Sequence, residues 1–213
     1  MSIPKNDRPQ LSGRKSHYSD PAPVVESKPR TVHLHVGELA LDLQADRGVF
    51  ASRGIDLGTR VLLREAPAPP AQGDILDLGA GYGPIAIALA RQAPAARIWA
   101  VDVNQRAVEL TRANASTAAV ANVTACTPDE VPDEVTFAAI YSNPPVRVGK
   151  TALHELLVRW LGRLGAGGRA YLVVQRNLGA DSLAAWLATQ GYEVQRLKSK
   201  KGYRILQVAN AES

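Results

Sequence analysis

The stretch Asp77-Leu78-Gly79-Ala80-Gly81-Tyr82-Gly83 determines how the rest of the chain is interpreted. It follows an apolar run at 74–76, typical of a buried strand, and precedes an apolar run at 84–90, which predicts a helix with Pro84 in its first turn. Glycines between a strand and a helix let the backbone turn tightly and approach a ligand, and the helix start offers unpaired N–H groups. The pattern predicts a nucleotide-binding turn.

The glycine spacing leaves two nucleotide classes open. Dinucleotide-binding folds use G-x-G-x-x-G, whereas this chain has G-x-G-x-G with Asp77 two residues before the first glycine. That variant resembles motif I of the methyltransferases that use S-adenosylmethionine, in which the acidic residue helps to order the loop around the amino-acid end of the cofactor. A strand-to-helix turn without any ligand is the third alternative.

The next expected strand, 97–101, ends in Asp102. An acidic residue at this place can accept hydrogen bonds from both ribose hydroxyls of a bound adenosine. That role suits a dinucleotide and S-adenosylmethionine equally, so Asp102 indicates a nucleoside without naming it. The alternative role, a charge at the start of the next helix, is less favoured because Asn104 already serves as the N-cap.

A second motif, Asn143-Pro144-Pro145-Val146, follows the expected strand 137–142. Consecutive prolines lack N–H donors and fix φ, so this loop is stiff. The Asn143 side-chain oxygen and the Pro144 carbonyl then form two fixed acceptors, which match the two N–H donors of a planar amino group. The motif resembles the segment of methyltransferases that act on amino groups of bases or amides; a simple strand terminator is the alternative.

Length and composition limit the class of protein. The 213 residues, 46% of them hydrophobic, suit one domain with a substantial core. No apolar run approaches the ~20 residues of a membrane span and no apolar signal segment is present, so we expect no membrane partner and a cytoplasmic location. The single cysteine, Cys126, excludes an internal disulfide and a cysteine-based zinc site. The net charge of +5 favours a polyanionic partner.

The part of the chain before motif I is expected to be an extension. Residues 1–16 are interpreted as a disordered basic arm, either a nucleic-acid contact or a solvated tail. Residues 17–73 are expected to hold a β-hairpin over 31–45 with His33 and His35 exposed, a glycine-rich loop over 46–59 and a short helix through 61–63. The loop either closes over a cofactor or serves as a linker.

Residues 74–213 alternate between strand and helix patterns, which predicts a doubly wound α/β sheet. The later expected elements are a short strand at 123–125, an amphipathic helix over 151–164 ended by the glycine run 165–168, a strand at 170–174, a helix capped by Asp181, and an antiparallel hairpin of 192–197 with 203–208 whose turn is 198–202.

The chain resembles the RsmC-like small-subunit rRNA methyltransferases in their single-domain form. The most specific matching segments are Asn143-Pro144-Pro145-Val146-Arg147-Val148-Gly149-Lys150 and Lys201-Gly202-Tyr203-Arg204. The other matching segments are His17-Tyr18-Ser19, Gly48-Val49-Phe50, Asp56-Leu57-Gly58-Thr59 and motif I. The resemblance implies a class I (Rossmann-like) methyltransferase fold, a seven-stranded sheet with an antiparallel last strand. It also implies methyl transfer from S-adenosylmethionine to guanine N2 in 16S rRNA, with rRNA or a ribosomal subunit as partner.

The motifs and the resemblance together give a set of expected site residues, and no metal is expected. Catalysis is assigned to Asn143, Pro144 and Pro145. Binding of S-adenosylmethionine is assigned to Asp77, Gly79, Ala80, Gly81, Gly83, Asp102, Val103, Asn143 and Thr59. Contact with RNA is assigned to Phe50, Arg147, Lys150, Lys198, Lys200, Lys201 and Arg204.

The sequence also departs from the family pattern. Cys126-Thr127-Pro128 stands where relatives often have an acid near the adenine, so backbone contacts to the adenine are expected. Val146 replaces an aromatic residue that stacks on the target base, so stacking is expected from Phe50 or not at all. Alternative substrates are adenine in nucleic acid and a protein glutamine. An alternative function is that of a non-catalytic RNA-binding domain. His154 is assigned to helix structure and not to catalysis.

Overall fold

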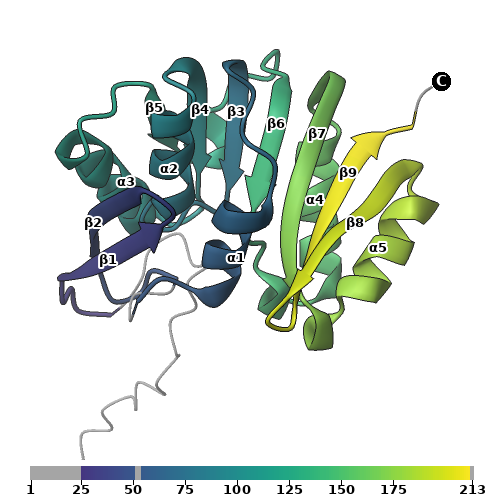
Figure 1. Cartoon of the computed structure of the whole chain (residues 1–213), viewed down its shortest axis with the longest axis horizontal. Coiled ribbons are helices and arrows are strands. Elements are labelled where there is room, and N and C mark those ends of the chain that lie inside the picture. The colour runs from purple at the N-terminus through teal and green to yellow at the C-terminus, as the bar shows by residue number, and fades with distance from the viewer. Residues whose placement is uncertain (1–24, 51–53, 212–213) are drawn as a thin grey trace, which may run out of the picture.

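The computed structural model describes residues 25–50 and 54–211 (Figure 1). In this part the chain forms a two-stranded hairpin and a seven-stranded sheet. The predictions for the arm at 1–16 and for His17-Tyr18-Ser19 lie outside the described residues.

The large sheet has the strand order β5-β4-β3-β6-β7-β9-β8. Five strands are parallel, β9 is antiparallel to β7, and β8 is antiparallel to β9, which confirms the expected sheet. The strands are β3 (Gln72–Leu78), β4 (Ala95–Val101), β5 (Val123–Cys126), β6 (Phe137–Ser142), β7 (Leu164–Gln175), β8 (Tyr192–Lys200) and β9 (Tyr203–Asn210).

Helices cover both faces of the sheet, as Figure 1 shows. The central strands are therefore buried on both sides: along β6, Ile140 packs into one core and Tyr141 into the other. One face is covered by α1 (Leu57–Glu65), α2 (Pro84–Gln92) and α3 (Gln105–Thr117), the other by α4 (Lys150–Leu161) and α5 (Ala180–Thr189).

The strand order reverses at β3. The chain moves from β3 to β4 and β5 on one side, and β6 then returns to the other side of β3. In open α/β sheets the crevice for a ligand lies beyond the carboxyl ends of the strands at such a point. Both sequence motifs follow these two strands, motif I at the end of β3 and Asn143 directly after β6. The fold thus brings the two motifs together.

The N-terminal hairpin packs on the helices beside motif I. It consists of β1 (Arg30–Val36) and β2 (Leu39–Ala45), with His33 and His35 on the exposed face, as predicted. Its inner face joins a core that includes Tyr82 of motif I and residues of α2 and α3. The buried Asn114 of α3 links these parts, because its side chain accepts from Gln44 N–H (2.7 Å) and donates to the Gln44 and Tyr82 carbonyls (2.8 Å each).

Three sequence-based boundaries were wrong. The glycine run 165–168 lies inside β7, where an irregular register faces Phe137, instead of ending the preceding helix. Asp181 lies within the first turn of α5, and Gly179 (φ 102°) is the N-cap. The last hairpin turns over Lys201 and Gly202 alone (φ 50° and 80°), because β8 continues to Lys200. Two left-handed residues match the twist of a tight hairpin.

We predict that Asn114→Ala lowers the free energy of unfolding by about 3 kcal/mol, because it removes one buried and two partly buried hydrogen bonds from the backbone of Tyr82 and Gln44. Urea denaturation followed by circular dichroism measures the change. Thr117→Ala, an exposed substitution on the same helix, is the control and should stay within about 0.5 kcal/mol of the wild type. Equal stability of the two variants would contradict this role of Asn114.

Candidate active site

Motif I forms a tight loop held against the end of β4. The N–H groups of Gly79 and Ala80 both donate to the Val101 carbonyl, at 2.9 and 3.1 Å. Gly83 ends the loop as the N-cap of α2 with φ 88°, and a Cβ there would come 2.9 Å from the Thr111 side chain. Only glycine fits both the left-handed backbone and this close approach.

Asp77 lies beneath the loop, fully buried. Its Oδ2 accepts from Ala86 N–H in the first turn of α2 at 2.9 Å, while its Oδ1 has no hydrogen-bond partner in the described part of the chain. Burial raises the pKa of this carboxyl to about 8; the Ala86 N–H opposes the rise and the negative charge of Asp102 adds to it. The side chain therefore supports the loop and the helix start from behind.

Asp102 ties β4 to motif I. One carboxylate oxygen accepts from Gly81 N–H (2.8 Å) and the other from Asn104 N–H (2.9 Å). Burial raises the pKa of this carboxyl, and the two N–H groups partly offset the rise. Each oxygen keeps a lone pair for a further donor. Asn104 is the N-cap of α3, as expected.

A cavity of about 310 Å³ opens beside Asp102. Its wall is largely apolar, and Asp102 and Asn143 are its charged or amide side chains. An apolar slot with one carboxylate and one amide fits a nucleoside, whose ring is apolar on both faces and whose ribose carries hydroxyl donors. Val103, 40% exposed, offers an apolar face next to the carboxylate. Its lining among the described residues is Phe50, Leu78, Gly79, Val101, Asp102, Val103, Pro128, Asn143, Pro144, Pro145, Val148, Ala152, Leu156 and Trp160.

The Asn143 amide is clamped by the N-terminal extension. Its Nδ2 donates to Asp56 Oδ1 (2.7 Å) and to Thr59 Oγ1 (3.2 Å). Because a carboxylate only accepts, the nitrogen must face Asp56, and the amide oxygen is left to accept from another group. Asp56 is also the N-cap of α1, accepting from the N–H groups of Gly58 (2.8 Å) and Thr59 (3.3 Å).

The proline loop after Asn143 makes one contact that the sequence did not predict. The Pro144 carbonyl already accepts from Val146 N–H at 2.8 Å, which leaves it one lone pair for a substrate donor. The loop continues into the short helical turn η2 (Val146–Val148) before α4. Asn143 borders a second cavity, of about 260 Å³, on the far side from Asp102. Its lining is Phe50, Asp56, Asn143, Pro144, Val146, Val173, Val174, Gln175, Leu178 and Tyr203.

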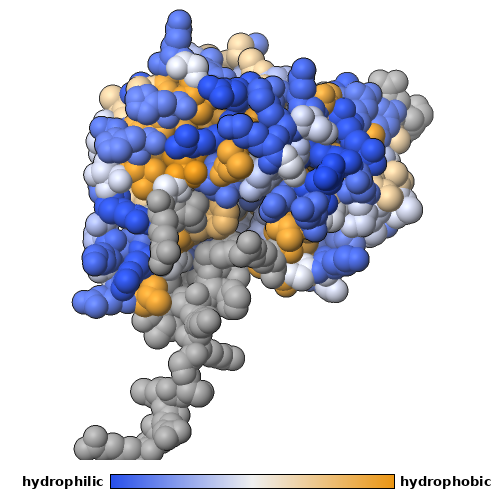
Figure 2. Space-filling view, turned by 60° about the horizontal axis from the view of Figure 1, so that its bottom comes forward, coloured by the Kyte–Doolittle hydropathy of each residue, from blue (hydrophilic) through white to orange (hydrophobic). Residues whose placement is uncertain are grey.

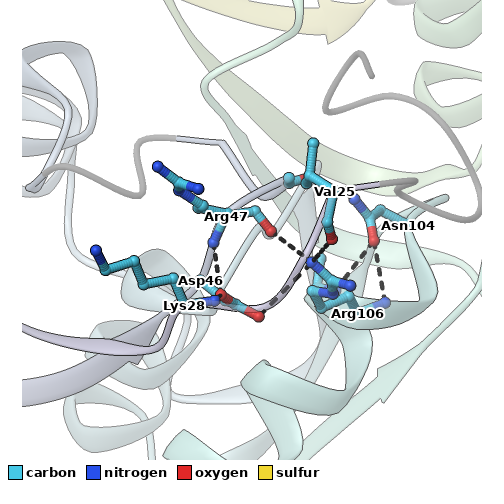
Figure 3. Close-up of polar contacts among 8 residues, drawn as sticks. Val25, Lys28, Asp46, Arg47, Asn104 and Arg106 are labelled. Atoms are coloured by element: carbon cyan, nitrogen blue, oxygen red, sulfur yellow. Dashed lines mark hydrogen bonds and ion pairs between the residues drawn. The ribbon is translucent and has the colours of Figure 1, made fainter. Parts of the chain in front are cut away.

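Phe50 stands where the cavities meet. It lines both the 310 and the 260 Å³ cavities, and also a small one between motif I and α1 lined by Thr59, Ala80 and Gly81. Its loop is anchored to the start of α3, since Asn104 Nδ2 donates to the Gly48 carbonyl at 2.8 Å. Figure 3 shows Asn104 at the start of α3, beside Arg106.

Arg106, in the first turn of α3, holds two segments of the N-terminal extension at once. Its guanidinium donates to the carbonyls of Arg47 (2.8 Å) and Val25 (3.0 Å) and lies 3.7 Å from Asp46 (Figure 3). Burial alone would raise the pKa of Asp46, but hydrogen bonds from Ser27, Lys28 and Arg47, with the charge of Arg106, lower it. The start of α3 therefore holds Asp102, through Asn104 N–H, and also the Phe50 loop, through Asn104 Nδ2 and Arg106.

The pleat of the last hairpin separates the basic residues assigned to RNA. Lys198 and Lys200 lie on the α1 face of β8, and Lys200 Nζ is 2.5 Å from Glu65. Arg204 lies on the α5 face, paired with Asp181. Lys150 is exposed in the first turn of α4, and the side chain of Arg147 lies outside the described part. In Figure 2, which brings the end with the carboxyl termini of the parallel strands forward, hydrophilic residues dominate the right-hand part of this surface.

Sequence reasoning missed Asp56 and Gly58. A Cβ on Gly58 would come 2.9 Å from the Tyr203 ring and 3.2 Å from Asn143 Oδ1, so this glycine admits both groups to the site. The local signal is Asp-x-Gly-Thr at a helix start, a pattern typical of N-capping. That pattern predicts the cap, but not the contact with Asn143, which lies 87 positions further along the chain.

Comparison with known proteins identifies the family. The family described as "Methyltransferase small domain" matches residues 40–207. The chain belongs to this family. Membership confirms the prediction of a methyltransferase of the class that uses S-adenosylmethionine and decides against a dinucleotide.

The relatives of this methyltransferase differ in length. The uncharacterized protein YbxB of Bacillus subtilis (strain 168) is 36% identical over 193 residues, covering 89% of this chain and 96% of that protein. The ribosomal RNA small subunit methyltransferase C of Escherichia coli (O1:K1 / APEC) is also 36% identical, over 62% of this chain and 39% of that protein. The chain thus spans less than half of the latter.

A solved structure shows the same fold. The 16S rRNA N2 G1207 methyltransferase (RsmC) of T. thermophilus, in complex with AdoMet and guanosine, superposes with a TM-score of 0.73 at 24% identity, covering 88% of this chain and 52% of that one. The likeness confirms the class I methyltransferase fold. Among the described residues of the present chain, no helix is long and apolar enough to cross a membrane, and no cluster of potential metal ligands is found.

We predict that Asp102→Ala weakens the binding of S-adenosylmethionine at least tenfold, because charge-assisted hydrogen bonds of ~1.5–3 kcal/mol each are lost from the ribose side of the cavity. Isothermal titration calorimetry measures the affinity. Glu109→Ala, an exposed acid of α3, is the matched control and should bind like the wild type. Equal affinity of Asp102→Ala and the wild type would remove Asp102 from the cofactor site.

We also predict that Asp77 makes stability fall with rising pH. The folded chain keeps this proton up to a pKa of about 8, whereas the unfolded chain loses it near 3.8. The unfolded state therefore binds fewer protons in this window, and the free energy of unfolding decreases as pH rises, with a limiting slope of about 1.4 kcal/mol per unit. Asp77→Asn should remove this contribution. Urea denaturation across the window compares the two proteins, and parallel pH profiles would refute the assignment.

Proposed function

We propose that the protein transfers a methyl group from S-adenosylmethionine to an exocyclic amino group of a base in rRNA, namely guanine N2 of the small-subunit RNA. The observation that carries this proposal is the clamped Asn143 amide between the two larger cavities, one with a carboxylate placed for a ribose and the other open for a base. In this arrangement the methyl donor and the base that accepts the methyl group occupy separate cavities, with the Asn143 side-chain oxygen between them.

The chain's own residues supply orientation. S-adenosylmethionine, when bound, provides an electrophilic sulfonium methyl group. A guanine amino nitrogen is a poor nucleophile, because its lone pair is spread into the ring. The Asn143 oxygen and the second lone pair of the Pro144 carbonyl accept its two N–H groups, which localises the nitrogen lone pair and aims it at the methyl group. Asp56 and Thr59 hold the amide so that it cannot turn its nitrogen toward the base.

The choice of rRNA and guanine is supported by the relatives and by charge. The matched E. coli and T. thermophilus proteins are named as ribosomal RNA methyltransferases, the latter as a guanine N2 enzyme with guanosine bound. The net charge of +5 suits a polyanion. Phe50 and Tyr203 line the second cavity and give it aromatic surface for a base, in the absence of an aromatic residue at Val146. Because the proposed substrate is ribosomal RNA, the proposed location is the cytoplasm.

The deciding experiment is mass mapping of rRNA nucleosides from cells with and without the gene. We expect one N2-methylguanosine of the small-subunit RNA to disappear and to return when purified protein and S-adenosylmethionine are added. Loss of a methyladenosine, or of a methylated glutamine in a protein, would replace guanine as the target. An unchanged methylation pattern in both RNA and protein would refute the proposal.

We predict that Asn143→Ala lowers the rate of methyl transfer by roughly 10²–10³, since a preorganised polar contact at the reacting group has this effect at comparable sites. Cofactor affinity should change little, because the ribose contact at Asp102 is retained. Single-turnover transfer of a tritiated methyl group measures the rate, and calorimetry measures the affinity. Transfer near the wild-type rate would exclude Asn143 as the acceptor of the amino group.

Variants of Asp56 provide a matched comparison for Asn143→Ala, because Asp56 positions the Asn143 amide and does not itself contact the base. Asp56→Ala should also slow transfer, mainly in kcat, because the amide loses its fixed orientation. Asp56→Asn keeps an oxygen that accepts from Asn143 Nδ2 and should restore most of the rate. A purely structural role of Asp56 in capping α1 would lower the stability of Asp56→Ala alone, because asparagine caps a helix as well as aspartate, and would leave kcat at the wild-type value in both variants.

A further inference from the structure

A fourth cavity, of about 150 Å³, lies at the turn of the last hairpin. Among the described residues, seven line this cavity, of which four are cationic and none is acidic. We call it the basic notch. Its lining is Arg176, Ser199, Lys200, Lys201, Gly202, Tyr203 and Arg204. Arg176 was not among the residues expected to bind RNA, whereas Lys198 was expected and does not line the notch.

The basic notch is built by fixed backbone contacts. Arg176 opens the short helical turn η3 (Arg176–Leu178) after β7, and its N–H donates to the Gly202 carbonyl at 2.8 Å. This bond joins η3 to the tight turn at Lys201 and Gly202. Because the turn has only two residues and both are left-handed, it has little freedom to carry Lys201 away from Arg176.

The charges around the basic notch are only partly balanced. Arg204 pairs with Asp181, but that carboxylate also pairs with Arg196, at 2.9 Å, so two cations share one acid. Lys200 pairs with Glu65. Arg176 and Lys201 have no acidic partner among the described residues. The notch therefore carries net positive charge at a fixed place, which is the requirement for holding an anion.

The basic notch adjoins the second cavity through one side chain. Tyr203 lines both, and the second cavity also contains Asn143. A nucleotide has the same arrangement, with a base on one side of its sugar and a phosphate on the other. A basic groove next to an aromatic ring is also a general solution for single-stranded nucleic acid.

We propose that the basic notch binds the RNA phosphodiester attached to the nucleotide whose base enters the second cavity. Arg176 and Lys201 make the contacts to the phosphate, and Tyr203 separates phosphate from base. This inference rests on the proposed function, since it takes the second cavity as the place of the target base. It adds a defined anion site that fixes the strand beside the catalytic loop.

The test uses a single-stranded oligoribonucleotide with one guanosine in a pyrimidine run, bound to the protein saturated with S-adenosylhomocysteine. The variants are Arg176→Ala, Lys201→Asn and the double variant. Asparagine is chosen at 201 because it tolerates the left-handed backbone better than alanine. Arg169→Ala is the control: it removes the same charge from within β7, seven residues before Arg176 and so about 23 Å away along an extended strand.

Binding is measured across a salt series. Each phosphate of single-stranded RNA that the protein neutralises contributes about 0.7 to the slope of log affinity against log salt. The double variant loses the contacts to one phosphodiester, so it should lose about 0.7 units of slope and bind roughly 5-fold more weakly at 0.1 M salt. Each single variant should lose about half of that slope. Arg169→Ala should keep the wild-type slope, and cofactor affinity should be unchanged in all variants.

Two results would overturn the proposal: a double variant with the wild-type slope and affinity, or a loss in Arg169→Ala equal to that in the double variant. The proposed function fails separately, if the wild type methylates no guanine in small-subunit RNA. Because the salt series measures binding and not methyl transfer, it tests the basic notch in either case.

Discussion

The position of Asn143, at the start of the proline loop, depends on the carboxylate of Asp56. One oxygen caps α1 through two N–H groups and also accepts from the Asn143 amide. The N-terminal extension is thereby joined to the end of β6, and the amide oxygen of Asn143 is left to face the cavities. Gly58 makes the arrangement sterically possible, since any side chain there would displace Asn143 or Tyr203. The extension thus helps to set the orientation of the Asn143 side chain.

The cofactor side is built in a similar way from β4. Asp102 uses both oxygens to hold the backbone of motif I and the start of α3, while α3 anchors the Phe50 loop through Asn104 and Arg106. Asp102 and the Phe50 loop, which borders both larger cavities, are therefore both anchored to the start of α3. The two halves of the site meet at Asn143 and Phe50, the side chains that line all three cavities around motif I and the proline loop.

Much of this was readable from the sequence, for physical reasons. Motif I and the proline loop are local patterns, since their glycines and prolines dictate backbone geometry within a few residues. The alternation of strand and helix patterns then predicted the sheet. The Asp56–Asn143 contact joins residues 87 positions apart, which no local pattern encodes. The end of β8 was missed because Lys198 and Lys200 have weak strand propensity, and tertiary pairing with β9 overrides it. Because β8 extends to Lys200, Lys198 and Lys200 lie on the α1 face of the hairpin and Arg204 on the α5 face.

The position of β8 at the edge of the sheet has a consequence for association between molecules. An edge strand exposes unpaired N–H and C=O groups that invite another strand to add to the sheet. Here Glu193, Arg196, Lys198 and Lys200 are exposed along it, and a register irregularity between Arg196 and Lys198 twists it locally. The opposite edge, β5, is only four residues long. Charge and irregularity on one side and shortness on the other disfavour edge-to-edge pairing of folded copies, so the lysines of β8 oppose aggregation through this edge whether or not RNA is present.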